Sequence, residues 1–151
     1  MAKVPGKSEL RIRRVRDRDV ERVRELSAQL GYPASAREMR GRLEAVIEDR
    51  EAACLVVESC EEGVIGWIHV SVTPLLEVER RAEVNGLVVD ERLRSRGAGA
   101  MLLAGGEKWA KGKRCKGMSV RSKVLRERAH EFYRRNGYEH YKTQKVFRKA
   151  L

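Results

Sequence analysis

Alternating and helical patterns of apolar residues divide the sequence into predicted strands and helices. Strand-like apolar runs occur at residues 10–15, 53–57, 64–72, 82–89 and 116–120, and the alternating segment 138–149 is predicted as a last strand that can divide into two. Helical spacing predicts helices from residue 17 or 19 to 30, after residue 35, and over 97–111 and 126–136. The order β-α-α-β-β-β-α-β-α-β predicts a three-layer α/β domain, with helices on both faces of a mixed, largely antiparallel sheet.

Local signals mark the ends of the helices and the faces that they bury. Ser35 and Glu38 form an S-x-x-E capping box for the second helix, and Asp17 or Asp19 can cap the first. Gly112 is expected to stop the helix over 97–111. The residues predicted to face the core are Val20, Val23, Leu26 and Leu30 on the first helix and Met39, Leu43, Val46 and Ile47 on the second.

A glycine-rich turn joins the strand over 82–89 to the next helix. Residues Arg94 to Gly99 read R-x-x-G-x-G, and a helix that starts in such a turn leaves backbone N–H groups free to bind an anion. Arg94 and Arg96 add positive charge, so the turn favours a phosphate or pyrophosphate. The Walker A motif is excluded, because no Lys-Ser or Lys-Thr follows Gly99, and the third glycine of the dinucleotide motif is Leu102. Taken alone, the loop is equally compatible with a simple turn and solvated arginines.

A second motif lies downstream, where residues 129–138 read A-x-x-F-Y-x-x-x-G-Y. With the R-x-x-G-x-G turn in this order, the chain from about Leu10 onward resembles the GNAT (general N-acetyltransferase) superfamily. The resemblance implies the acyl-CoA N-acyltransferase fold, acetyl-CoA as cofactor, and direct attack of a primary amine on the acetyl group in a ternary complex.

The resemblance also implies which residues bind acetyl-CoA. Its pyrophosphate would lie on Arg94, Ser95, Arg96, Gly97, Ala98, Gly99 and Ala100. The backbone of Leu87 and Val89 would pair with the pantetheine arm, and an N–H near Val88 or Val89 would face the thioester oxygen. The family's Asn that grips the pantetheine region is replaced by Arg126, which could contact cofactor phosphates instead.

Two side chains are predicted to be catalytic. Tyr133 occupies the position of the family's tyrosine, where its phenol can protonate the leaving thiolate or hydrogen-bond the sulfur; packing beside Phe132 is the alternative, with Phe132 assigned to the core and Tyr133 to the cleft. By resemblance, Glu83 is the candidate general base, because it lies six residues before Val89, the offset at which some family members place their base Glu. A carboxylate is also disfavoured inside a strand, so it should have a reason to be there. A surface ion pair of Glu83 with Arg80 or Arg81 is an equal alternative, and His69 and water are rival bases.

Composition limits the remaining possibilities. The 151 residues suggest a flexible tail over 1–8 and one domain over 9–151. No apolar stretch reaches the ~20 residues of a membrane span, the start lacks an apolar signal region, and three cysteines without C-x-x-C spacing suit neither a disulfide framework nor a zinc site. We therefore expect a cytoplasmic protein with no metal site.

The net charge of +11 bears on the partners of the protein. Aromatic residues make up only 5% of the chain, and 22 acidic residues are mixed among 33 basic ones, so a nucleic-acid partner is not favoured. The alternative function is a basic nucleic-acid-binding or regulatory module on an inactive acetyltransferase fold. By resemblance, the acceptor walls are residues 31–33, 75–79 and 141–144, and the ending at 142–149 is similar to a small-molecule branch near aminoglycoside acetyltransferases. Glu77, Glu79 and Glu83 could attract a cationic amine, so a small-molecule amine is preferred to a protein N-terminus. Whether the protein forms a homodimer is left open by the sequence.

Overall fold

The computed structural model describes residues 9–151. The predicted tail over residues 1–8 lies outside the described residues. Contacts between Cα atoms divide the chain into two compact units, one that ends at Arg121 and one that comprises residues 122–151. The prediction of a single domain over 9–151 stays a prediction.

The first unit is built on a five-stranded sheet in the order β1-β2-β3-β4-β5. Its strands are β1 (Arg11–Arg14), β2 (Ala52–Ser59), β3 (Gly63–Val72), β4 (Ala82–Val89) and β5 (Met118–Val120). Neighbouring strands are antiparallel except β4 and β5, which are parallel. The long connection between β4 and β5 contains a helix, as a parallel pair requires. This arrangement confirms the predicted mixed, largely antiparallel sheet.

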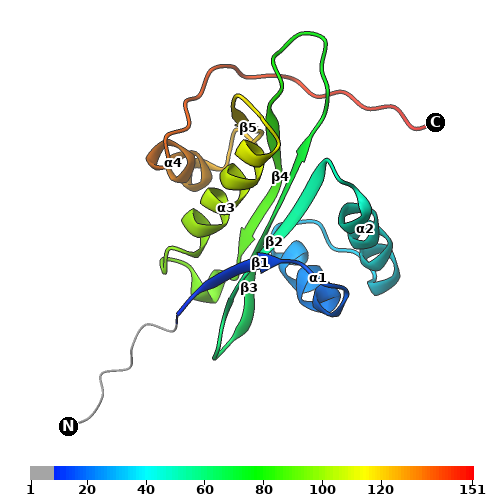
Figure 1. The fold of residues 1–151 in the computed structure, drawn as a ribbon, viewed down its shortest axis with the longest axis vertical. Coiled ribbons are helices and arrows are strands. Elements are labelled where there is room, and N and C mark those ends of the chain that lie inside the picture. The colour runs from blue at the N-terminus through cyan, green and yellow to red at the C-terminus, as the bar shows by residue number, and fades with distance from the viewer. Residues whose placement is uncertain (1–8) are drawn as a thin grey trace. The chain divides into compact units, whose positions relative to one another are not determined.

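Helices cover both faces of the sheet (Figure 1). Helices α1 (Val20–Gln29) and α2 (Ala36–Glu48) lie on one face, and α3 (Ala98–Gly112) lies on the other. Two single-turn 3₁₀ helices, η1 (Asp17–Asp19) and η2 (Glu91–Leu93), precede α1 and α3. The unit is therefore the three-layer α/β arrangement that the sequence predicts.

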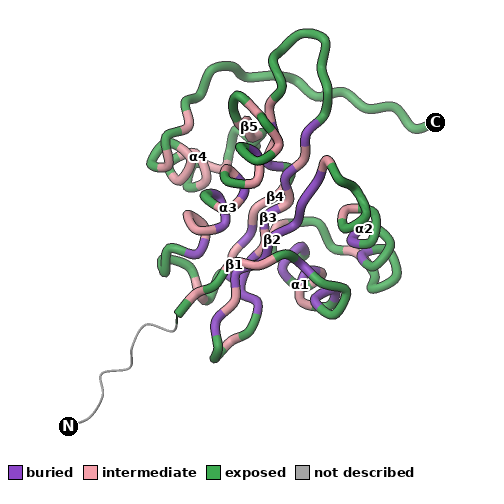
Figure 2. The backbone as a smooth tube through the Cα atoms, in the orientation of Figure 1, coloured by how far each residue is buried: buried purple, intermediate pink, exposed green. Residues whose placement is uncertain are grey.

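The core lies between these layers, and Figure 2 shows it as the buried stretches along the central strands. On the side of α1 and α2, Leu26 and Val56 are fully buried. On the other side α3 approaches the sheet closely at two glycines. A Cβ atom at Gly105 would lie 3.1 Å from Leu55, and one at Gly106 would lie 3.1 Å from Val70. Side chains at these two positions would push the helix away from the strands.

Most helix signals act as predicted, but Asp19, Ile47 and Gly112 differ from their predictions. Ser35 accepts a hydrogen bond from the backbone N–H of Glu38, whose carboxylate accepts one from the N–H of Ser35. Asp19 makes no capping hydrogen bond to α1; it accepts bonds from the Arg16 N–H and from the Arg13 guanidinium, at 2.8 and 2.9 Å. Ile47 was predicted to be inward but is 44% exposed, since Met39, Leu43 and Val46 already form the inward stripe.

The end of α3 also differs from the prediction. Gly112 lies within the helix, and the left-handed residue that follows is Arg114, with φ 61°. No helix among residues 9–151 combines the length and hydropathy that crossing a bilayer requires.

The second unit contains one helix, α4 (Glu127–Arg135), followed by Gly137 with φ 89°. The predicted strand over 138–149 is wrong: residues 138–151 belong to no strand. Alternation makes a sequence compatible with a strand, but a strand exists only where its backbone joins a ladder of hydrogen bonds. The segment also buries little apolar surface, since Val146 and Phe147 are 83% and 87% exposed.

Candidate active site

The segment between β4 and α3 is anchored by a buried carboxylate. Asp90 directly follows β4 and is completely buried. It accepts hydrogen bonds from the side chain and backbone N–H of Arg92, and from the Arg22 guanidinium of α1 at 2.6 Å. These bonds, chiefly those from Arg92 and then that from Arg22, hold the pKa of Asp90 well below its usual range. The start of the glycine-rich loop is thus fixed to a neighbouring helix.

The loop itself has the backbone conformation of an anion cradle. Ser95 and Gly97 have φ of 70° and 80°, and Gly97 is followed by the right-handed residues of α3. A left-handed residue next to a right-handed one turns successive N–H groups toward one concave surface. Gly97 is the N-cap of α3, so the first free N–H groups of the helix lie at the same place. A Cβ atom at Gly97 would meet nothing within 4 Å, which leaves space in front of the helix for a ligand.

One of the two loop arginines already has a carboxylate partner. Arg96 Nη1 lies 3.0 and 3.1 Å from the two carboxylate oxygens of Glu62, in the turn between β2 and β3. Glu62 also accepts a hydrogen bond from the Ser59 hydroxyl, and these bonds lower its pKa, with Ser59 contributing most. Arg94 is exposed and makes no ion pair within residues 9–151.

The second half of β4 has an open edge. Strand β5 pairs with β4 only at Ala82, Glu83 and Val84. In the part of the chain that the structure describes, residues 86–89 pair with β3 on one side and with no strand on the other. Strand β4 separates from β5 beside Asn85, which forms a β-bulge. Val84 pairs with Val70 and Gly86 pairs with His69, so Asn85 is an extra residue without a register partner on β3. Backbone groups of Leu87 to Val89 at this edge are therefore available to an extended ligand.

The bulge also determines which side chains share the face covered by α1 and α2. Glu83 lies opposite Ser71 in the register, and His69 lies two residues before Ser71 on the same side of β3. The Asn85 amide donates to the Ser71 hydroxyl at 2.7 Å. The structure thus brings the two candidate bases, Glu83 and His69, to one face of adjacent strands. Burial lowers the pKa of His69, against a small opposing effect of Asp49.

Glu83 forms an ion pair, but with a different arginine from those predicted. Its Oε1 lies 3.1 Å from Nε of Arg121, just beyond β5. Arg80 instead binds Glu51 at 2.6 Å. The parallel pairing of β4 with β5 places Glu83 beside Ser119, so residue 121 is close by, and this neighbourhood is not visible in the sequence.

The predicted proton donor belongs to the second unit. Tyr133 on α4 is half-buried, and burial raises the pKa of its phenol while Arg126 opposes the shift. Its ring lies at 5.2 Å from that of Phe132 and at 5.8 Å from that of Tyr138, edge-on in both cases. Phe132 is half-buried rather than fully buried, so the two rings share one aromatic group within this unit. A phenol with a raised pKa stays protonated at neutral pH, as a proton donor must.

Sequence reasoning missed three contributors to the site. Asp90 and Arg22 are 68 residues apart, and neither lies in a motif. Glu62 likewise lies in no motif, in the connection between β2 and β3. The one available signal was the position of Asp90, a carboxylate at the end of an apolar strand next to a phosphate-type loop.

Comparison with known proteins agrees with this geometry. The profile of the Acetyltransferase (GNAT) family matches residues 20–138. The chain belongs to the GNAT acetyltransferase family. The matched range contains both motifs on which the resemblance was based, and family membership confirms the predicted N-acetyltransferase activity with acetyl-CoA as the acetyl donor.

Solved structures confirm the fold across nearly the whole chain. Aminoglycoside N-acetyltransferase AAC(6')-Iy, solved in complex with CoA, superposes with a TM-score of 0.86 at 20% identity, over 98% of this chain and 99% of that one. AAC(6')-Ih from Acinetobacter baumannii gives 0.84 at 16% identity, over 95% and 99%. A protein described as a transcriptional regulator from Bacillus halodurans C-125 gives 0.81 at 20% identity, over 92% and 100%. No match is found among curated protein sequences.

Proposed function

We propose that this GNAT acetyltransferase transfers the acetyl group of acetyl-CoA to a primary amine of a small cationic molecule, by direct attack within a ternary complex. The observation that carries the proposal is the cradle at residues 94–100, followed along β4 by an open backbone edge and then by Glu83, with His69 on the same face of β3. Phosphate-binding, extended-chain-binding and proton-accepting groups therefore occur in the order in which they are needed along one acyl donor and its acceptor.

The cradle fits the pyrophosphate of acetyl-CoA. Residues 95–100 supply backbone N–H groups at the positive end of a 15-residue helix. Arg94 and Arg96 supply two guanidinium groups. Arg96 would exchange the carboxylate of Glu62 for a phosphate oxygen, and Arg126 is a further candidate for phosphate contact.

The open edge of β4 fits the pantetheine arm. In this proposal the backbone N–H and C=O groups of Leu87 and Val89 pair with its amides, as an added strand would. An N–H near Val88 or Val89 polarises the thioester carbonyl. When bound, acetyl-CoA supplies an acetyl group activated by its thioester bond.

Proton transfer is assigned to side chains on both sides of the reacting bond. Glu83 removes a proton from the attacking ammonium group directly or through water, and His69 is the rival base. A lowered pKa keeps His69 neutral and able to accept a proton at physiological pH. On the leaving-group side, the phenol of Tyr133 protonates the thiolate or hydrogen-bonds the sulfur.

A small cationic acceptor is supported by charge near the proposed base. Glu77 and Glu79 are exposed in the connection between β3 and β4, which leads directly into Glu83. The same connection exposes Leu76 completely, so a ligand with both amino groups and apolar surface finds partners there. Two structural neighbours are described as aminoglycoside N-acetyltransferases.

The test is release of free CoA thiol from acetyl-CoA against a panel of amines. The panel contains aminoglycosides, polyamines, amino acids and peptides with free N-termini. We expect turnover with one of the polycationic small molecules, and stabilisation of the protein by acetyl-CoA alone. Preferential turnover of peptides would contradict the acceptor class. No turnover, together with DNA retention that survives ~0.2 M salt, would favour the nucleic-acid-binding alternative.

A further inference from the structure

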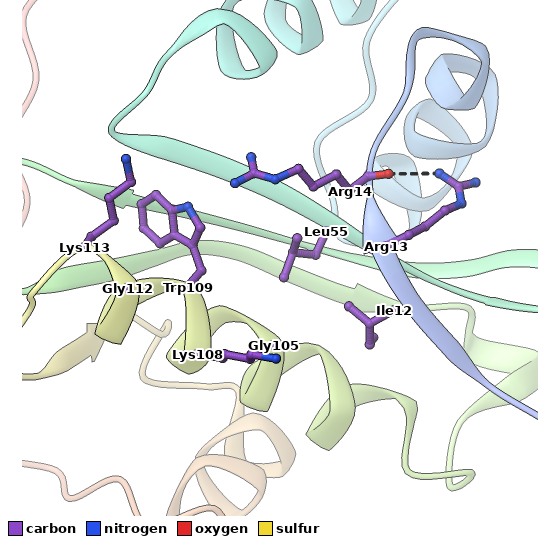
Figure 3. Close-up of a pocket in the computed structure, with 9 residues that line it drawn as sticks. All are labelled: Ile12, Arg13, Arg14, Leu55, Gly105, Lys108, Trp109, Gly112 and Lys113. Carbon is purple, nitrogen blue, oxygen red and sulfur yellow. Dashed lines mark hydrogen bonds between the residues drawn. The ribbon is translucent and has the colours of Figure 1, made fainter.

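A second concave site lies away from the cofactor loop. A groove of about 520 Å³ runs between β1, β2 and the C-terminal half of α3 (Figure 3). Its floor is Ile12 and Leu55, one wall is the indole of Trp109, and Arg14, Lys108 and Lys113 surround it. At 1.5 Å per helical residue, Trp109 is ~18 Å along α3 from Gly97. The groove therefore belongs neither to the pyrophosphate cradle nor to the face that carries Glu83.

The groove has an excess of cations over carboxylates. The side chains of Arg14 and Lys108 make no ion pair or hydrogen bond with the described residues 9–151. Lys113 lies 3.9 Å from Glu51, but that carboxylate is held more closely by Arg80, at 2.6 Å. A concave surface lined by charges of one sign concentrates ligands of the opposite sign.

The indole of Trp109 adds a directional donor. Its Nε1–H is buried and meets no acceptor within the described residues, and a buried donor without an acceptor costs about 1–3 kcal/mol. The ammonium of Lys113 lies 5.9 Å from the ring centroid. Figure 3 shows the Arg14 side chain extending from β1 toward the same indole. Two cations therefore lie near an indole whose N–H has no acceptor among the described residues.

The shape of the groove restricts the rest of the ligand. Gly105 and Gly112 are on the lining face of α3, so no side chain fills the groove at these two positions on either side of Trp109. A flat apolar body can lie against the Trp109 ring and over Ile12 and Leu55, where stacking and burial stabilise it. We infer that this groove binds a small aromatic carboxylate, with its carboxylate between Arg14, Lys113 and the indole N–H, independently of the acetyl-transfer site.

Ligand-observed ¹⁹F NMR tests this inference with 4-fluorobenzoate as the probe and 4-fluorobenzamide as its neutral isostere. We expect the carboxylate to bind the full-length protein at least ~10-fold more tightly than the amide, because only the anion gains charge-assisted hydrogen bonds. Saturating CoA should leave this binding unchanged. Arg14→Gln should weaken it by roughly 5- to 10-fold, whereas Lys111→Gln should not, although it removes the same charge from an exposed position of α3 outside the groove.

Four results would overturn the inference. The first two are that 4-fluorobenzoate does not bind below ~10 mM and that 4-fluorobenzamide binds equally well. The third is that Arg14→Gln and Lys111→Gln weaken binding of the probe equally. The fourth is that CoA displaces the probe, which would place the probe at the cofactor loop. Displacement by inorganic phosphate at similar concentration would overturn the aromatic class in favour of a phosphate site. Stabilisation by acetyl-CoA, measured in parallel, tests the proposed function separately.

Discussion

Arg121 forms an ion pair with Glu83 across the parallel strands β4 and β5, with 3.1 Å between Nε and Oε1. The ion pair fixes the proposed base at the point where the two strands diverge, because β4 loses its β5 partner after Val84. Glu83 is thus a positioned, half-buried carboxylate beside Ser71 and on the same face as His69. Its role as the base can be separated from that of His69 by the pH dependence of catalysis.

If Glu83 is the base, kcat/KM should rise with pH through one ionisation that is absent in Glu83→Gln. Glu79→Gln is the matched control, since Glu79 is an exposed carboxylate in the preceding connection. Acceptors of different amine pKa separate this ionisation from that of the substrate. If the rise of kcat/KM with pH persists in Glu83→Gln and is lost in His69→Ala, the base is His69. If neither variant removes it, the amine loses its proton to water.

Gly97→Glu should abolish the rise in Tm that acetyl-CoA produces. The carboxylate would project into the open space at the N-terminus of α3, where the pyrophosphate is proposed to lie. Gly97→Ala introduces the strain of a side chain at φ 80° without the charge, and Gly117→Glu places the same charge at another uncrowded glycine. Both controls should retain most of the shift. An unchanged shift in Gly97→Glu would remove the loop from the cofactor site.

Glu62→Gln should tighten CoA binding several-fold, because Arg96 would no longer be held by a carboxylate that competes with phosphate. Calorimetric titration with CoA at two salt concentrations measures the change. Glu61→Gln, at the exposed neighbouring position of the same turn, controls for the loss of one negative charge. Weaker binding in Glu62→Gln would mean that Glu62 orients Arg96 rather than competing for it.

Tyr133→Phe should lower kcat by ~10- to 1000-fold with little effect on Tm, because the ring contacts with Phe132 and Tyr138 are kept while the donor is lost. Burial raises the pKa of Tyr133, so the phenol should remain a donor up to at least its ordinary pKa of ~10. Steady-state kinetics and thermal melts measure the two effects. Full activity in Tyr133→Phe would reduce the residue to packing.

Asp90 should make the protein sensitive to acid. Its folded-state pKa is lowered, so its stabilisation is fully present above the unfolded pKa of ~3.9 and is lost as pH falls below that value. Asp90→Asn should reduce the free energy of unfolding at pH 7 by about 3–5 kcal/mol, because Arg22 loses a buried partner. The unfolding free energy of Asp90→Asn, measured by urea denaturation, should also depend less on pH between 5 and 3 than that of the wild type.

Exposed Asp17 provides the matched control for this titration. Asp17→Asn should keep the acid dependence of the wild type. Part of that dependence should remain in Asp90→Asn as well, because Asp19 also has a lowered pKa through its bonds to Arg13 and Arg16. An Asp90→Asn profile parallel to that of the wild type would contradict the assignment.

Features with local causes were predictable from the sequence. The capping box of Ser35 and Glu38 and the glycine-rich turn before α3 depend on residues within a few positions of one another. The bond between Arg22 and Asp90 depends on the packing of α1 against the end of β4, which no local pattern encodes. Asn85 lies inside an apolar run that reads as one continuous strand, so its bulge was not visible. The segment 138–149 shows the converse error, because alternation describes a strand but does not provide its partner.

The bulge at Asn85 has a consequence for protein engineering. One additional residue reverses the alternation of β4, so that Glu83 and Val88 point to the same face although five positions separate them. A chimera that replaces residues 82–89 with an unbulged strand of eight residues would keep either the proposed base or the core contact of Val88 in register, but not both. Loop grafts intended to change the acceptor should therefore end before Ala82.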